Sequence, residues 1–166
     1  MPLLTIYDLR EDHQRIRWLQ EATLTTRDLG LEPTHGLFGS ADWWRNVARG
    51  HLPTYRLAGV ITNTYNIGDS DHPEFSMVDS AGIETTWNRE VNRTEDDALY
   101  IVGRMVELAY VMQRRRVDLS DLGIDHTEKC ILSIKIEASR ARKYRSGNTS
   151  RHLPGATLER ALGLVQ

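Results

Sequence analysis

Side chains able to do acid–base, metal or nucleophilic chemistry are present, but their spacing matches no known site. The segment Asp69-Ser70-Asp71-His72-Pro73-Glu74 offers oxygen and imidazole ligands, yet it lacks the ligand spacing and the glycine of a calcium loop. Asp121, Asp125 and His126 form a carboxylate–imidazole group without a third ligand or a nucleophile in a known arrangement. The glycines are scattered and none belongs to a phosphate-binding loop. We therefore predict no catalytic residue, no metal site and no cofactor, and we keep a hydrolase with an Asp/His site as a third alternative.

Aromatic residues and arginines suggest binding instead of catalysis. Trp43 and Trp44 are adjacent on a short predicted helix, so one can enter the core while the other stays near the surface, where Trp often anchors a partner. Tyr65 and Trp87 lie on predicted strands, where aromatic rings either pack into the core or stack on bases. The basic cluster Arg114-Arg115-Arg116 ends a predicted strand and would either grip phosphates or pair with local acids. The predicted binding set is Trp43, Trp44, Tyr65, Trp87, Arg114, Arg115 and Arg116.

The charges are unevenly distributed along the chain. The net charge of −2 divides into −1 for residues 1–50 (6 basic, 7 acidic), −6 for 51–137 (9 basic, 15 acidic) and +5 for 138–166 (6 basic, 1 acidic). An acidic β domain is a poor electrostatic match for a phosphate backbone. The basic tail carries five leucines and valines that favour burial, so we expect part of it to dock, either in cis or between subunits.

Size and cysteine content indicate a single intracellular domain. A chain of 166 residues fits one domain, which we divide into a helical N-terminal segment (1–50), a β-barrel (51–137) and a basic tail (138–166). The one cysteine, Cys130, lies in an apolar run and is predicted to be a buried, inert thiol. The N-terminus does not resemble a signal peptide and no run approaches the roughly 20 apolar residues of a membrane helix. We expect a cytoplasmic protein without a membrane partner.

The fold class follows from alternating β-like runs punctuated by turn signals. We predict strands at 54–65, 75–78, 83–88, 100–113 and 130–137, with a hairpin turn at 79–82 and bends at Gly59 and Gly103. Helices are predicted at 9–28, capped by Asp8, and at 40–50, capped by Ser40. The class is mainly β, α+β overall: a small curved antiparallel β-barrel with an N-terminal helical segment and a basic C-terminal tail.

The five strands with their internal glycines resemble an OB-fold barrel over residues 54–137. The resemblance departs at 89–99, where a short charged connection replaces the helix usual in that fold. We predict a non-enzymatic binding or assembly module whose partner is a protein or a second copy of the chain. The alternative is a single-stranded nucleic-acid-binding protein that uses the barrel face, the arginine cluster and the tail.

Overall fold

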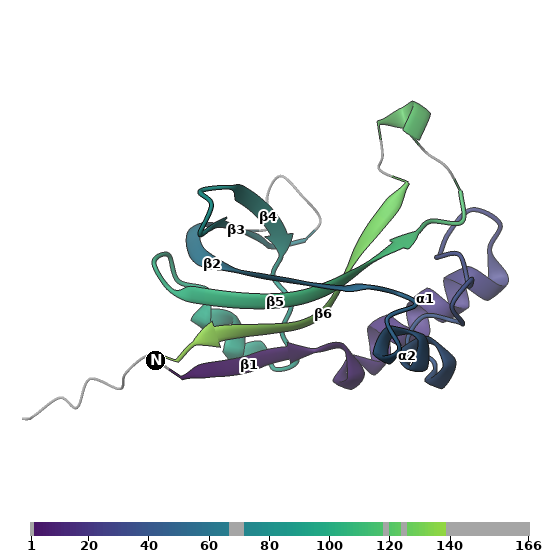
Figure 1. The fold of residues 1–166 in the computed structure, drawn as a ribbon, viewed down its shortest axis with the longest axis horizontal. Helices are drawn as coiled ribbons and strands as arrows, with labels where there is room; N and C mark the ends of the chain where they lie inside the picture. Colours follow the sequence, from purple (N-terminus) through teal and green to yellow (C-terminus); the bar gives the residue numbers. More distant parts are fainter. Residues whose placement is uncertain (1, 67–71, 118–119, 124–125, 139–166) are drawn as a thin grey trace, which may run out of the picture.

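One antiparallel sheet organises the protein in a computed structural model that describes residues 2–66, 72–117, 120–123 and 126–138 (Figure 1). Its strand order is β1-β6-β5-β2-β3-β4. The strands are β1 Leu3–Asp8, β2 Thr54–Tyr65, β3 Glu74–Asp79, β4 Glu84–Asn88, β5 Met105–Arg114 and β6 Thr127–Glu137. The helices are α1 His13–Thr25 and α2 Ala41–Ala48, with short 3-10 helices η1 Leu9–Glu11, η2 Thr94–Leu99 and η3 Ser120–Leu122. The predicted basic tail, apart from Ala138, lies outside the described residues.

The predicted fold class, a mainly β protein built on a curved antiparallel sheet, is confirmed. The sheet contains one strand more than predicted, because β1 pairs with β6 and extends the sheet at that edge. The sequence around β1 lacks strict alternation, since a bulge lies between Thr5 and Tyr7 and buries the adjacent side chains of Ile6 and Tyr7. A period-two pattern could not reveal this strand.

The structure corrects the prediction of a strand at 100–113. β5 begins only at Met105, because residues 94–99 form the 3-10 helix η2 and Gly103 has a φ of +91° in the turn that follows. Gly59 lies within β2, where its role is close approach: a Cβ there would lie 2.3 Å from the Val78 carbonyl oxygen. Gly59 therefore allows β3 to approach β2 closely, and Gly103 allows the turn before β5.

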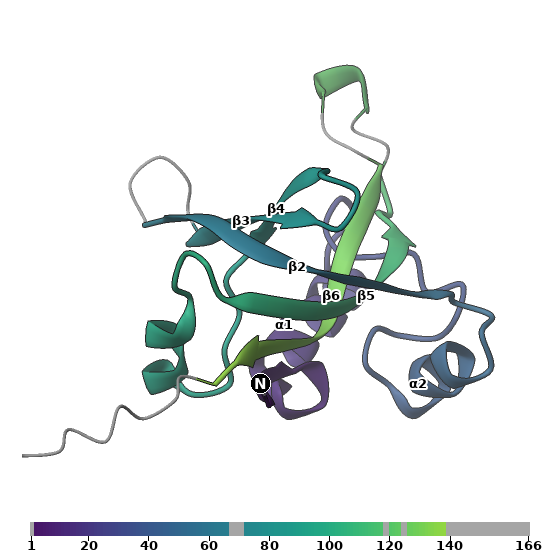
Figure 2. The same cartoon turned by 60° about the vertical axis from the view of Figure 1, so that its left-hand side comes forward.

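The N-terminal helical prediction is correct in type and too long in extent. Asp8 caps η1 by accepting a hydrogen bond from the Arg10 amide, and Asp12 caps α1 by accepting one from the Arg15 amide. The second helix begins as predicted, with the Ser40 hydroxyl accepting a hydrogen bond from the Trp43 amide. Both helices lie at one end of the sheet (Figures 1 and 2). None of the helices in the described ranges is both long and apolar enough to cross a bilayer.

Bulges in three of the five ladders produce the curvature of the sheet. The register shifts in β1–β6, in β2–β3 near Thr62 and in β5–β6 beside Tyr110. Each extra residue increases the local twist and bends its strand. The β3–β4 hairpin therefore curls out of the plane of the other strands (Figure 1).

The core occupies the interior of this curved sheet and continues beneath the helices. Seven apolar side chains of the strands are buried and Leu57 is half-buried; the seven are Ile61, Phe75, Met77, Val106, Leu108, Leu132 and Ile134. The same cluster includes Tyr7 and Leu9 from the N-terminus and Trp43 from α2. The core therefore joins the helical segment to the sheet.

Ile134 provides a test of this packing, because it is fully buried between Tyr7 on β1 and Leu108 on β5. Ile134→Ala should lower the free energy of unfolding by about 2–5 kcal/mol, measured by urea denaturation. Met105→Ala is the matched control, because Met105 lies on β5 with 42% of its surface exposed. Equal effects of the two substitutions would contradict the assigned strand register.

Cys130 is buried, as predicted, with 1% of its surface exposed. Burial raises the pKa of its thiol from an ordinary 9.0 to about 12. The folded state therefore keeps the neutral thiol in a pH range where the unfolded chain releases the proton.

Between pH 9 and 10 the free energy of unfolding should fall with rising pH, because the unfolded state binds fewer protons there. The fall is at most about 1.4 kcal/mol per pH unit for a single group. Cys130→Ala should be less stable at neutral pH and should lose this part of the pH dependence in urea titrations. An unchanged slope in the variant would show that the thiol does not couple to folding.

Candidate functional site

A groove of about 720 Å³ lies beside α1. We call it the α1 groove. One wall is α1 with the segment that follows it, and the other is formed by the ends of β4, β5 and β6 with the residues next to them. Its lining residues are Asp12, Gln14, Arg15, Trp18, Leu19, Asp28, Leu29, Gly30, Leu31, His72, Asn88, Glu90, Arg115, Val117 and Glu128.

Two large apolar side chains of the groove remain open to solvent. Trp18 on α1 is 60% exposed and Leu29 is 55% exposed. The neighbouring Leu19 and Leu31 are buried and attach this wall to the core. An exposed Trp beside an exposed Leu in a concave surface is typical of a place where another molecule binds.

An ion pair connects the two walls of the groove. Arg15 on α1 donates to the Glu90 carboxylate at 2.5 Å, and each side chain is 21% exposed. Burial alone would lower the pKa of Arg15, but the Glu90 charge, with smaller contributions from Tyr7 and Cys130, raises the pKa overall. Burial also raises the pKa of Tyr7, whose hydroxyl donates to the Asp12 carboxylate at 3.1 Å. The first turn of α1 is therefore fixed by one ion pair and one side-chain hydrogen bond.

The groove has more acidic than basic side chains. On the sheet side, Arg115 pairs with Glu128 at 2.8 Å. The lining contains four carboxylates, on Asp12, Asp28, Glu90 and Glu128, against the two guanidinium groups of Arg15 and Arg115. Both arginines are thus already paired within the chain, and the surplus charge of the groove is negative.

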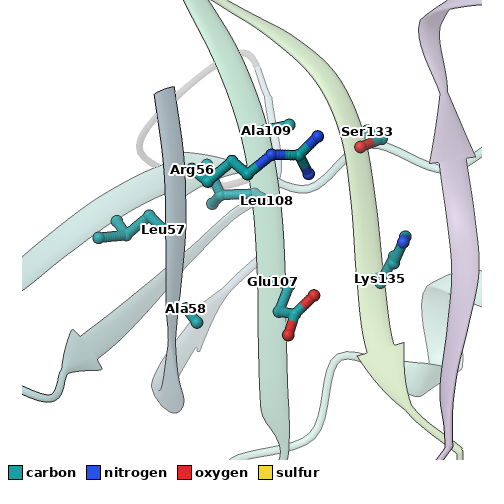
Figure 3. Close-up of a pocket in the computed structure, with 8 residues that line it drawn as sticks. All are labelled: Arg56, Leu57, Ala58, Glu107, Leu108, Ala109, Ser133 and Lys135. Carbon is teal, nitrogen blue, oxygen red and sulfur yellow. The ribbon is translucent and has the colours of Figure 1, made fainter. Parts of the chain in front are cut away.

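A second, smaller depression of about 230 Å³ lies on the open face of β2, β5 and β6 (Figure 3). Ala58, Ala109 and Ser133 form a low floor, above which Arg56, Glu107 and Lys135 rise. Glu107 lies opposite both Ala58 and Lys135 in the ladders. This depression is smaller than the α1 groove, and the three side chains that rise above its floor are charged.

Comparison with protein families supplies the biological context for these surfaces. The model of a family described as Immunity protein RhsI2 matches residues 4–137. This chain belongs to the RhsI2 immunity protein family. No curated protein matches it. The match begins in β1 and ends with the last residue of β6, so it covers nearly the whole sheet and both helices.

The two tryptophans predicted as binding residues in this RhsI2 family member have different environments. Trp43 is fully buried, and its indole N–H donates to the Gln113 side-chain oxygen at 2.9 Å. Trp44 is half-buried, and the Arg10 guanidinium lies 4.0 Å from the centre of its ring. Trp43 is therefore a core residue, and binding through Trp44 stays a prediction.

The two predicted aromatic residues on the sheet also differ. Tyr65 is 41% exposed and its hydroxyl lies 3.2 Å from that of Ser76. Trp87 is only 5% exposed, packs against Tyr110 with ring centres 4.8 Å apart, and is covered by the Lys129 ammonium at 4.9 Å. Trp87 is thus largely inaccessible, and Tyr65 lies outside the α1 groove.

The arginine cluster of this RhsI2 family member makes contacts mainly within its own chain. Arg114 donates to His126 at 2.9 Å, and Arg115 pairs with Glu128 in the groove. Arg116 donates to the carbonyls of Thr23 and Thr26 at 2.6 Å each, where α1 ends. A cation at this position satisfies free carbonyls and interacts favourably with the helix dipole.

The sequence prediction included Arg115 of the groove and missed Trp18. The sequence did contain a signal for Trp18, because it directly precedes Leu19, an apolar residue of the predicted helix that α1 buries. Adjacent helical residues point apart, which is the argument applied to Trp43 and Trp44. In the described ranges no group of three or more His, Cys, Asp or Glu side chains is placed to hold a metal ion. Asp69, Asp71 and Asp125, which the sequence analysis considered as possible metal ligands and set aside, lie outside those ranges.

Arg116 should stabilise the fold more than its neighbour Arg114. Arg116→Met removes two hydrogen bonds from a charged donor to α1 and should cost about 1–3 kcal/mol in urea unfolding. Arg114→Met, at an exposed position, should change stability by less than about 0.5 kcal/mol. A neutral result for Arg116→Met would show that α1 ends without help from β5.

Proposed function

We propose that this protein is a non-enzymatic immunity protein that protects a cell by binding a toxin and blocking its action. The observation that carries the proposal is the RhsI2 family match, which spans the whole described sheet. A match of this extent concerns the complete folded body and not a short motif.

The distribution of reactive and exposed groups supports binding as the means of protection. The phenol and thiol groups with raised pKa values, those of Tyr7, Tyr100 and Cys130, are buried, and burial is the main cause of the rise in each. They are held neutral in the core, where they have no access to a substrate. By contrast, the open groove carries an exposed Trp and an exposed Leu, which suits protein contact.

Electrostatics favour a protein partner over a nucleic acid. The family-matched residues 4–137 carry 15 basic and 22 acidic side chains, a net charge of −7. Nucleic-acid binding depends on neutralising phosphates with basic side chains, and this body has the opposite excess. We place the encounter in the cytoplasm, because a single buried cysteine suits a reducing compartment.

A growth assay and a titration test the proposal together. The cognate toxin is defined as the toxin that a host cell tolerates only when this chain is co-expressed. Purified toxin should co-elute with the chain in size-exclusion chromatography. Toxin activity should fall linearly as the chain is added and reach its minimum at a fixed stoichiometric ratio.

The titration separates binding from enzymatic protection. A catalytic protector would inactivate many toxin molecules per chain, and lasting inactivation by a small fraction of one equivalent would contradict the proposal. Failure of the purified proteins to associate, despite protection in cells, would also contradict it. An unrelated protein, added in place of the chain at the same concentration, serves as the negative control in both assays.

A further inference from the structure

We infer that the α1 groove is the toxin-binding surface and that its occupant is a basic segment of the toxin bearing an apolar side chain. The inference rests on the proposed function and adds the interface and the chemistry of the partner. It begins from a concave surface of about 720 Å³ whose apolar and charged parts are held in place by contacts within the chain.

The apolar part of the inference comes from Trp18 and Leu29. They are 60% and 55% exposed and belong to the same groove, so a side chain inserted between them would be shielded from water on more than one side. Burying an aromatic ring at the centre of an interface provides much of the energy in typical protein complexes. A Trp at this position also has few rotatable bonds, so its immobilisation costs little entropy.

The basic character of the occupant follows from the unpaired charge of the groove. Arg15 is paired with Glu90, and Arg115 is paired with Glu128. Asp28 is exposed at the rim and takes part in no ion pair among the described residues. The net charge of −7 on residues 4–137 has the same sign, so a basic toxin surface would be attracted at long range and matched at contact.

The walls of the groove are held in position before any partner arrives. The Arg15–Glu90 pair joins α1 to the segment after β4, and Arg116 holds the end of α1 against the end of β5. A preformed surface loses less conformational freedom on binding than a mobile one. The depression of Figure 3 is smaller, has two cationic side chains against one carboxylate, and would suit an acidic partner instead.

Two sets of substitutions, each with its own control, test the inference in a binding assay with the cognate toxin defined above. Trp18→Ala and Leu29→Ala remove apolar groups from the groove, and Leu24→Ala is the control, because Leu24 is 67% exposed on the same helix but does not line the groove. Trp18→Ala should raise Kd by about 30-fold or more, Leu29→Ala by about 5-fold or more, and Leu24→Ala by less than about 3-fold.

The charge is tested by Asp28→Lys against Glu21→Lys, which introduces the same charge at an exposed position of α1 outside the groove. Asp28→Lys should slow association several-fold at low salt and reduce its salt dependence, and Glu21→Lys should have a clearly smaller effect. Arg56→Glu should leave the affinity within about 2-fold. Circular dichroism and urea unfolding confirm that each variant is folded.

The outcomes separate the two proposals. If the wild-type chain binds the toxin and both Trp18→Ala and Leu29→Ala bind equally well, the groove is the wrong surface while the immunity function stands. If Asp28→Lys associates with the toxin faster than the wild-type chain, the toxin surface is acidic, and the inference of a basic occupant is wrong. A loss of toxin affinity in Arg56→Glu would show that the interface lies on the sheet face instead. A wild-type chain that binds no toxin would overturn the proposed function itself.

Discussion

The end of β5 is the constraint on which the N-terminal half of the molecule depends. The Gln113 side chain, 4% exposed, accepts a hydrogen bond from the Trp43 indole and donates one to the Glu32 carbonyl. The Glu32 amide donates to the Arg114 carbonyl, and Arg116 binds the end of α1. A buried polar side chain is stable only when its hydrogen bonds are made. Gln113 therefore fixes α2 and the segment after α1 in one arrangement relative to the sheet.

The same arrangement shapes the α1 groove. Because Arg116 fixes the end of α1 and the Arg15–Glu90 pair fixes its beginning, Trp18 lies on a helix that is anchored at both ends. The two ion pairs of the groove are partly shielded, so removing one partner would leave a charge poorly solvated. These paired charges therefore stabilise the fold, whereas Asp28, Trp18 and Leu29 remain accessible to a partner. The fold and the proposed binding surface therefore use different residues of the same groove.

The sequence was sufficient for the elements with local signals. The bounds of β2 were predicted to the residue, and Ser40 was recognised as the cap of α2, because alternation and capping depend on neighbours in the chain. β1 was missed because its pairing with β6 joins distant residues across a bulge. The arginine cluster was recognised as notable, but the acceptor carbonyls of Arg116 lie about ninety residues away and have no signature in the sequence. Among the residues that line the groove, only Arg115 belonged to the predicted binding set. The groove itself could not be predicted, because its two walls come from distant parts of the sequence and meet only in the folded chain.

The β1 edge of the sheet favours recognition by side chains over addition of a strand. The open edge of β1 is occupied near its end by Asn92, whose amide donates to the Ile6 carbonyl and whose side chain bonds both the amide and the carbonyl of Asp8. A partner strand would need these same groups to pair with β1 over this stretch. Backbone pairing carries little sequence information, whereas a groove with a Trp, a Leu and a surplus of carboxylates discriminates by shape and charge. The proposed recognition of a toxin is therefore better served by the groove than by the β1 edge.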